Sequence, residues 1–327
     1  MKIISLSAAV SCLALSSAAL AETPVLTVMA YDSFVAEWGP GPMIEKAFEE
    51  GCGCDLRFIS GGDGAATLAR LQLEGANSEA DVVMGLDTNL TAQAVATGLF
   101  APHGQPPAEA LPVPYDDAYF LPFDWSWLAF VYDKNRVPNP PDSLDALAAS
   151  DLKVVIQDPR SSTPGLAIVM WVKAVKGDGA ADYWKALSDN ILTVTPGWSE
   201  AYSLFTDGET DMVLSYSTSP AYHRLAENDD SKDWAAFSDG HYMQIEVSGI
   251  LASSKQPELA KQFMAFTQSP AFQSLIPEGN WSYPVTNIAL PEGFETKRPE
   301  KSLILDADEA LALREAAVAE WQAALAR

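Results

Sequence analysis

The sequence is poor in the residues that carry most metal and redox chemistry. Among its 327 residues there are three cysteines and three histidines, and His103, His223 and His241 are scattered along the chain. A metal site needs several such ligands at short spacing, which the sequence does not provide. It also lacks a G-x-S-x-G turn, an H-E-x-x-H helix and a glycine-rich nucleotide-binding loop. We therefore expect a protein that is not an enzyme, with no catalytic residues, no metal and no cofactor.

Basic residues are scarce as well. Lys and Arg total 20 against 44 Asp and Glu, a formal charge of −24. Such a surface repels phosphate backbones and anionic lipid headgroups, so nucleic-acid binding and membrane docking are excluded as main functions. The excess of acid favours a small cationic partner. It would equally serve solubility alone, and both interpretations stay open at this point.

Only the N-terminus carries a sustained hydrophobic run. Lys2 supplies a positive start, residues 3–15 are apolar or small, and Ala19-Leu20-Ala21 has the small-x-small pattern that signal peptidase cleaves. The run is too short to span a bilayer, and no other stretch approaches 18 apolar residues. We expect residues 1–21 to be a signal peptide cleaved after Ala21, and the mature protein to be exported, monomeric and not inserted in a membrane.

Two of the cysteines, Cys52 and Cys54, remain in the mature chain one residue apart. In an oxidising compartment they could form a tight disulfide, or they could be two free thiols. The sequence leaves both alternatives open.

Strand-like and helix-like segments alternate in the N-terminal part of the mature chain. Segments rich in apolar and β-branched residues are followed each time by a segment with helical spacing of apolar residues. The strands are expected at 25–30, 55–59 and 81–85, and the helices at 43–50, 65–74 and 89–97. Continuous apolar strands that alternate with helices predict an α/β fold with a mostly parallel sheet flanked by helices.

The pattern resumes after two long extended runs, at about 124–132 and 241–251. Further strands are expected at 153–157 and 212–216, and helices at 164–176, 258–266 and 306–326. Two α/β units joined by two extended crossings predict two lobes with a cleft between them. We assign residues 22–123 and 242–290 to the first lobe, and residues 124–241 and 291–327 to the second.

Three turns place polar groups where a predicted strand gives way to a helix. They are Asp63-Gly64, Arg160-Ser161-Ser162-Thr163-Pro164-Gly165 and Leu214-Ser215-Tyr216-Ser217-Thr218-Ser219-Pro220. In parallel sheets ligands gather at the carboxyl ends of strands, and free N–H groups at a helix start bind anions such as phosphate. Each turn is equally explained as an ordinary helix cap.

Five aromatic residues lie beside Gly, Pro or strand ends and not within helical stripes. They are Tyr31, Trp38, Trp198, Tyr222 and Trp281. Aromatic rings in such places often line pockets and stack on flat ligands or on cations. Packing in the core is the alternative for each of them.

Motifs from end to end of the mature chain resemble the periplasmic thiamine-binding proteins of bacterial thiamine ABC importers. The matching stretches include Tyr31-Asp32-Ser33-Phe34, Trp38-Gly39-Pro40-Gly41-Pro42, Phe130-Val131-Tyr132-Asp133-Lys134-Asn135, Ser162-Thr163-Pro164-Gly165-Leu166, Gly197-Trp198-Ser199-Glu200-Ala201-Tyr202, Ser219-Pro220-Ala221-Tyr222-His223 and Gly279-Asn280-Trp281. Segments 102–114 and 226–236 match less well.

The resemblance implies a type II periplasmic binding protein fold, whose two lobes close on thiamine or its phosphate esters and present them to an ABC importer permease. Carried over by position, the ligand contacts are Asp63, Gly64, Ser162, Thr163, Trp198, Tyr216, Ser217, Thr218 and Ser219, with Tyr31, Trp38, Tyr222 and Trp281 as aromatics at the cleft. Aromatic faces suit the rings of thiamine, a carboxylate suits its amino group or its cation, and hydroxyls at helix starts suit a phosphate.

Three alternatives are kept beside this interpretation. Ferric-iron receptors of related fold have adjacent tyrosines, which this chain lacks, and a polyamine site needs several carboxylates in the cleft, where the sequence indicates only Asp63. A secreted hydrolase is the alternative from a different class. The sequence does not rank thiamine against its monophosphate and diphosphate.

Overall fold

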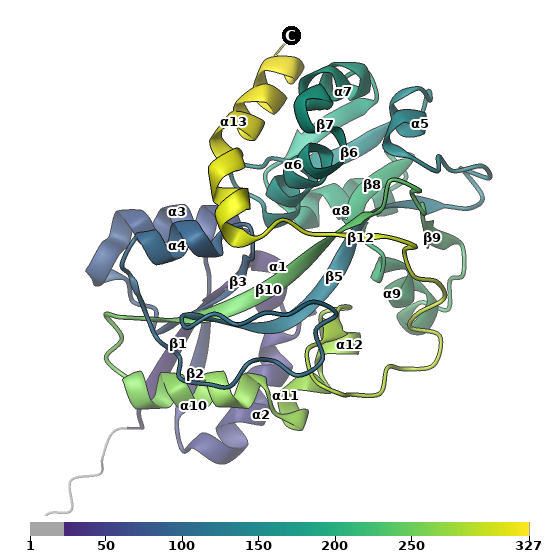
Figure 1. The fold of residues 1–327 in the computed structure, drawn as a ribbon. Coiled ribbons are helices and arrows are strands. Elements are labelled where there is room, and N and C mark those ends of the chain that lie inside the picture. The colour runs from purple at the N-terminus through teal and green to yellow at the C-terminus, as the bar shows by residue number, and fades with distance from the viewer. Residues whose placement is uncertain (1–22, 327) are drawn as a thin grey trace, which may run out of the picture.

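The computed structural model describes residues 23–326, so the predicted signal peptide and its cleavage site lie outside the described residues. Two α/β halves are joined through one mixed sheet, with the strand order β2-β1-β3-β10-β5-β8-β6-β7 (Figure 1). Within residues 23–326 no helix is long and apolar enough to cross a membrane.

The first half is built on three parallel strands that are covered by helices. Its elements are β1 (Val25–Ala30), α1 (Asp32–Val35), α2 (Gly41–Cys52), β2 (Asp55–Ser60), α3 (Gly64–Glu74), the 3-10 helix η1 (Gly75–Asn77), β3 (Val82–Asp87), α4 (Thr91–Ala96) and β4 (Phe100–Ala101). Every residue of β3 is buried, as expected for a strand covered on both faces. The predicted alternation of strands and helices is confirmed here.

The second half repeats this architecture. It contains α5 (Leu144–Ala148), β6 (Val154–Gln157), α6 (Thr163–Lys176), η2 (Gly177–Gly179), α7 (Ala180–Leu187), β7 (Ile191–Thr195), α8 (Trp198–Thr206), β8 (Met212–Tyr216), α9 (Ser219–Ala226) and β9 (Lys232–Trp234). Strand β6 pairs in parallel with both β7 and β8.

Two long strands connect the halves, as the sequence predicts. β5 (Phe120–Asp133) and β10 (His241–Leu251) pair antiparallel with each other, while β10 also pairs with β3 and β5 with β8. β5 begins at Phe120, earlier than expected, because Pro122 is accommodated where the β5–β10 register shifts beside Val247. The two-lobe fold is therefore confirmed, whereas the boundaries of the lobes stay a prediction.

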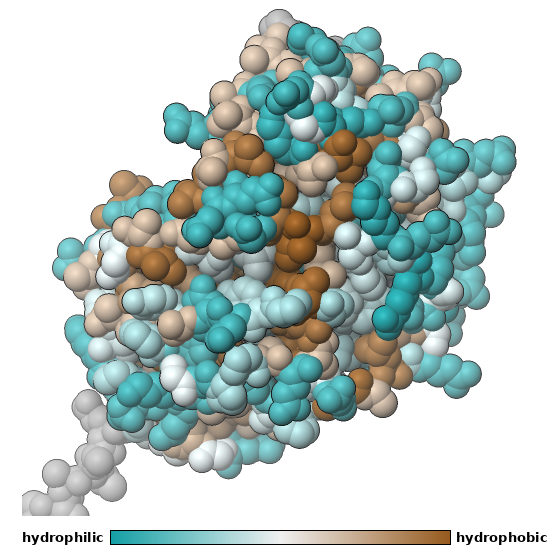
Figure 2. Space-filling view, viewed as in Figure 1, coloured by the Kyte–Doolittle hydropathy of each residue, from teal (hydrophilic) through white to brown (hydrophobic). Residues whose placement is uncertain are grey.

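The C-terminal part of the chain covers both halves. α10 (Pro257–Thr267), α11 (Pro270–Gln273) and α12 (Ile276–Gly279) pack near α2, and β11 (Tyr283–Pro284) and β12 (Ser302–Leu303) extend the sheet. The long helix α13 (Ala307–Leu325) contacts α6 and α7 of the second half and also α4 of the first (Figure 1). On the face shown in Figure 2, hydrophilic residues cover both halves, and hydrophobic ones gather along the middle.

The cysteine pair lies at the end of α2. Gly53 adopts a left-handed conformation with φ of 63°, which ends the helix, and Cys52 and Cys54 are joined by a disulfide. Of the two alternatives that the sequence leaves open, the structure contains the disulfide.

Candidate functional site

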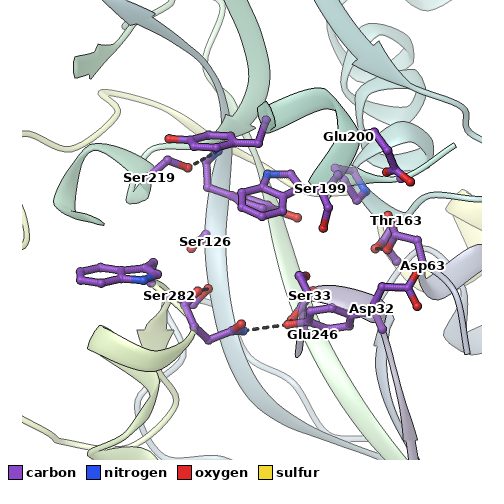
Figure 3. A pocket seen from close by; sticks show the side chains of 18 of the residues that line it. Asp32, Ser33, Asp63, Ser126, Thr163, Ser199, Glu200, Ser219, Glu246 and Ser282 are labelled. Carbon is purple, nitrogen blue, oxygen red and sulfur yellow. Dashed lines mark hydrogen bonds between the residues drawn. The ribbon is translucent and has the colours of Figure 1, made fainter. Parts of the chain in front are cut away.

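A cavity of about 710 Å³ lies between the two halves. Asp63 and Thr163 lie next to each other on one side of it, and Ser219 and Ser282 lie on the other (Figure 3). The crossing strands β5 and β10 contribute Asp124 and Glu246. Residues from both halves and from both crossings therefore face one space.

Most of the residues singled out from the sequence meet at this cavity. The predicted residues that line it are Tyr31, Trp38, Asp63, Thr163, Trp198, Tyr216, Ser219, Tyr222 and Trp281. Gly64, Ser162, Ser217 and Thr218 do not line it, although each adjoins a lining residue in the chain. Whether any of the thirteen contacts a ligand stays a prediction.

The hydroxyl of Ser162 serves the backbone of α6. Ser162 is fully buried, and its Oγ accepts a hydrogen bond from the N–H of Gly165 at 3.3 Å, which makes it the N-cap of the helix. Thr218 is buried likewise and bonds Ser126 through their hydroxyls at 3.2 Å. Both hydroxyls thus take part in hydrogen bonds within the protein, and their contact with a ligand stays a prediction.

The aromatic lining forms two pairs in the second half and in the loop after α12. Trp198 stacks on Tyr202 with ring centroids 4.8 Å apart, and its Nε1 donates to Ser215 Oγ at 2.8 Å. Tyr222 meets Trp281 edge to face at 5.4 Å. Trp38 is 67% exposed, so its ring is available at the edge of the cavity. These rings offer both stacking faces and contacts for a cation.

Trp281 is held in an uncommon backbone conformation, with φ of 52°. A bulky residue other than glycine is rarely left-handed, and such residues concentrate at functional sites. The preceding Asn280 donates from Nδ2 to Asp124 Oδ2 at 2.5 Å and to the Tyr31 hydroxyl at 2.8 Å. These bonds fix the loop that presents Trp281 to the cavity.

The two halves touch directly at one side of the cavity. Thr163 Oγ1 donates to Asp63 Oδ1 at 2.9 Å, and the N–H of Ala66 donates to the carbonyl of Ser161 at 2.9 Å. A Cβ on Gly64 would lie 2.5 Å from Thr163 Cγ2, so only glycine allows this approach. The starts of α3 and α6 therefore face each other, and the structure is a closed arrangement.

Asp63 is the carboxylate that the sequence places in the cleft. Its Oδ1 also accepts from the N–H of Gly64 at 2.8 Å and caps α3, whereas its buried Oδ2 has no hydrogen-bond partner. Burial raises the pKa of Asp63, and donors from Ser162, Gly64 and Thr163 oppose that rise. An unpaired buried acceptor is costly, so Oδ2 is available to a donor from a ligand.

Sequence reasoning missed most of the acidic lining. Besides Asp63, the cavity is lined by Asp32, Asp124, Glu200, Glu227 and Glu246, and no described lining residue is Lys, Arg or His. The expectation of a single convincing carboxylate in the cleft is therefore wrong. Asp124 and Glu246 interrupt the apolar crossing segments, and an acidic residue within a buried strand was the available signal.

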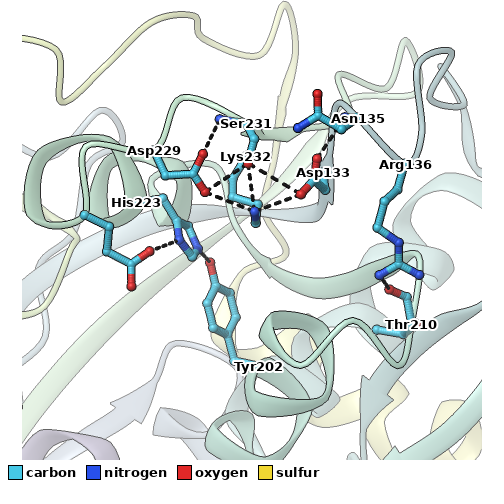
Figure 4. Close-up of polar contacts among 10 residues, drawn as sticks. Asp133, Asn135, Arg136, Tyr202, Thr210, His223, Asp229, Ser231 and Lys232 are labelled. Carbon is cyan, nitrogen blue, oxygen red and sulfur yellow. Dashed lines mark hydrogen bonds and ion pairs between the residues drawn. The ribbon is translucent and has the colours of Figure 1, made fainter.

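One further group of ligand-type side chains lies beside the cavity (Figure 4). Within residues 23–326, the only set of three His, Cys, Asp or Glu side chains close enough to share a metal ion is His223, Glu227 and Asp229. Both nitrogens of His223 are engaged, Nδ1 with Glu227 at 2.7 Å and Nε2 with the Tyr202 hydroxyl at 2.9 Å. Asp229 is paired with Lys232 at 3.1 Å. The group is thus a hydrogen-bonded support behind Tyr202.

Comparison with known proteins agrees with this geometry. The model of the bacterial extracellular solute-binding protein family matches residues 40–274. The thiamine-binding periplasmic protein of Escherichia coli strain K12 is 52% identical over 320 residues, which is 96% of this chain and 98% of the relative. That of Salmonella typhimurium is 52% identical over 93% of this chain and 94% of its own. A solved periplasmic thiamin binding protein superposes with a TM-score of 0.92 at 51% identity, covering 93% of this chain and 97% of that one.

Proposed function

Because the chain belongs to the bacterial extracellular solute-binding protein family, we propose that it captures thiamine and its phosphate esters in the cavity between its lobes. It then presents them to the membrane permease of an ABC importer from the periplasm. It acts as a monomer, needs no cofactor and does not turn its ligand over.

The chemistry of the cavity lining carries this proposal. Thiamine combines a flat aminopyrimidine with a permanently cationic thiazolium ring. Seven aromatic residues and six acidic residues line the cavity, and no described lining residue is basic. Aromatic faces attract a cation while they stay apolar, and carboxylates complement its charge and accept from the amino group. The names of the relatives at 52% identity point to the same ligand.

The other small cations are less well matched. A polyamine would use the carboxylates but leave the aromatic faces without a flat partner. Ferric iron prefers several hard anionic ligands around one point. The one described group of three such ligand types, around His223, has its donor atoms engaged within the protein.

Titration of the ligand-free protein with thiamine tests the proposal. Trp38, Trp198 and Trp281 line the cavity, so occupancy should change tryptophan fluorescence along a saturable one-site curve. Thiamine monophosphate and thiamine diphosphate are titrated in parallel, and spermidine and ferric citrate serve as controls. Chromatography of the recovered ligand checks that it is unchanged. A response to spermidine or iron without one to thiamine would contradict the proposal, as would hydrolysis of the phosphate esters.

A further inference from the structure

We propose that Asp124 and Glu246 form a carboxyl pair that recognises the positive charge of the ligand and gives up a proton when the cation binds. This inference rests on the proposed function and concerns the same cavity. It assigns charge recognition to two residues of the crossing strands, and it makes binding dependent on pH in a stated direction.

The strand pairing places the two carboxyl groups together. Asp124 of β5 lies directly opposite Glu246 of β10 in the antiparallel register, which shifts immediately after Glu246. Side chains of directly opposed residues lie on the same face of a sheet, with Cβ atoms about 5 Å apart. Both residues line the cavity, and they are 0% and 8% exposed, respectively.

The partners of this pair are neutral. The Tyr31 hydroxyl donates to Glu246 Oε2 at 2.8 Å, the Gln244 amide donates to Glu246 Oε1 at 3.3 Å, and Asn280 donates to Asp124. Asp124 Oδ1 and Gln244 Oε1 are buried acceptors with no partner at all. Two buried acids without a basic partner, next to unfilled acceptors, form an incomplete site that a cation or a donor would complete.

Three ionisable groups surround the pair. Asp63 faces it from the start of α3, Tyr31 from the end of β1 and Tyr216 from the end of β8. The charge of Asp63 raises the pKa of Glu246 and makes its negative charge harder to hold, whereas the hydrogen bond that the Tyr31 hydroxyl donates lowers that pKa. Burial raises the pKa of Asp124 to about 7, and burial together with the charge of Asp124 raises the pKa of Glu246 well above its ordinary value. Near neutral pH the ligand-free pair therefore holds at least one proton.

Arrival of a permanent cation reverses this balance. A positive charge close to two carboxyl groups favours their ionised form, so the pair loses a proton to the solvent while no covalent bond is made or broken in the ligand. By linkage, a ligand whose binding releases a proton binds more tightly as the pH rises. A pair that used its proton to donate to the ligand would give the opposite sign.

Calorimetry of thiamine binding measures the proton directly. Titrations at one pH near neutrality in two buffers of different ionisation enthalpy give the number of protons exchanged, and we expect release of up to about one. Between about pH 6 and about pH 8, where free thiamine keeps a constant charge, the affinity should rise by up to about tenfold per pH unit. Proton uptake, no exchange, or an affinity that falls with pH would overturn the inference while leaving thiamine binding intact.

Variants then locate the proton. Glu246→Gln and, separately, Asp124→Asn should each abolish most of the proton release and weaken thiamine binding. Glu109→Gln removes the same charge at an exposed position that does not line the cavity, and it should retain both the proton release and the affinity. Thermal melting of each variant confirms folding, and the wild-type proton count stands even if a variant fails to fold.

If Glu246→Gln and Asp124→Asn both keep the wild-type pH dependence of thiamine binding, the pair is not the source of the released proton. Absence of any thiamine binding by the wild type would remove the proposed function itself, and this inference with it.

Discussion

At the scale of one residue, the backbone conformation of Trp281 places its side chain at the cavity. Its left-handed conformation and the two hydrogen bonds of Asn280 fix the ring opposite Tyr222, where it lines the cavity and stays only partly buried. A core tryptophan would be fully enclosed. We therefore expect the ring to contact the part of the ligand that thiamine and its phosphate esters have in common.

Trp281→Ala should weaken the binding of thiamine and of its two phosphate esters by similar factors. A cation–π contact contributes about 0.5–2 kcal/mol, so the loss should be about tenfold in each dissociation constant. Fluorescence of the remaining tryptophans or calorimetry measures it. Trp281→Phe, which keeps an aromatic face, is the control and should recover most of the affinity. A large drop in the melting temperature of the ligand-free Ala variant, with affinity preserved, would make Trp281 a packing residue.

Ser162 illustrates the opposite case, a polar residue beside the cavity that is committed to the fold. Its Oγ caps α6 through Gly165 and is fully buried. Ser162→Ala should lower the free energy of unfolding by about 1 kcal/mol, the usual cost of a lost N-cap. Urea unfolding measures this, and Ser162→Thr, which keeps the hydroxyl, is the matched control. Loss of affinity for the phosphate esters alone, with stability unchanged, would instead place Ser162 at the phosphate.

At the scale of elements, α13 is a C-terminal helix that contacts both halves. Asp306 caps its start by accepting from the N–H of Glu309 at 2.8 Å, and Lys173 of α6 pairs with Glu320 at 2.8 Å. Trp321, 4% exposed, is among its buried residues and belongs to the main core. Burial of this side chain, more than the ion pair, should hold the helix in place.

Trp321→Ala should therefore destabilise the protein by about 3–5 kcal/mol, the typical cost of deleting a buried tryptophan. The Nε1 of Trp321 has no hydrogen-bond partner, so Trp321→Phe should cost much less. Glu320→Gln, which breaks the ion pair, should cost under about 1 kcal/mol. Chemical denaturation compares the three variants. A loss under about 1 kcal/mol for the Ala variant would show that α13 does not contribute to the core.

At the scale of the whole molecule, buried acids make stability depend on pH. Burial raises the pKa of Asp87 and of Asp124 to about 7 from 3.8, whereas burial lowers the pKa of His241 to about 4 from 6.5. Above about pH 6.5 the unfolded chain has lost its carboxyl protons while the folded protein still holds some on Asp87 and Asp124. An unfolded histidine is half protonated at pH 6.5 and mostly neutral above about pH 7.5, so the proton that His241 lacks in the folded state offsets only part of this difference. The folded state then binds more protons, so stability falls as the pH rises.

The melting temperature of the ligand-free protein should accordingly be lower at pH 8 than at pH 6.5. The free energy of unfolding should fall by up to about 1.4 kcal/mol per pH unit for each extra proton that the folded state holds. Asp87→Asn, whose amide cannot ionise, should flatten the slope. Asp116→Asn at an exposed position should leave it unchanged. Calorimetric melting across this range is the measurement, and a melting temperature that rises from pH 6.5 to pH 8 would contradict the assignment.

The sequence by itself determined the elements and the character of the ligand. Helical spacing at 65–74 and continuous apolar residues at 81–85 predict α3 and β3 closely, because local backbone preference and burial pattern are properties of neighbouring residues. The two crossings, the aromatic residues beside turns and the acidic charge are likewise evident in the sequence. The family motifs added the type II periplasmic binding protein fold and the positions of the candidate ligand contacts.

Only the tertiary structure decided which of these residues act together. Asp124 and Glu246 become neighbours through the register of two strands far apart in the chain, and Asn280 reaches Asp124 from the loop after α12. The packing of the two halves places Thr163 against Asp63, beside Ser162, which caps α6. Sequence patterns report which face of an element is buried, but contacts between distant segments depend on strand register and on how the lobes pack, which no local pattern encodes.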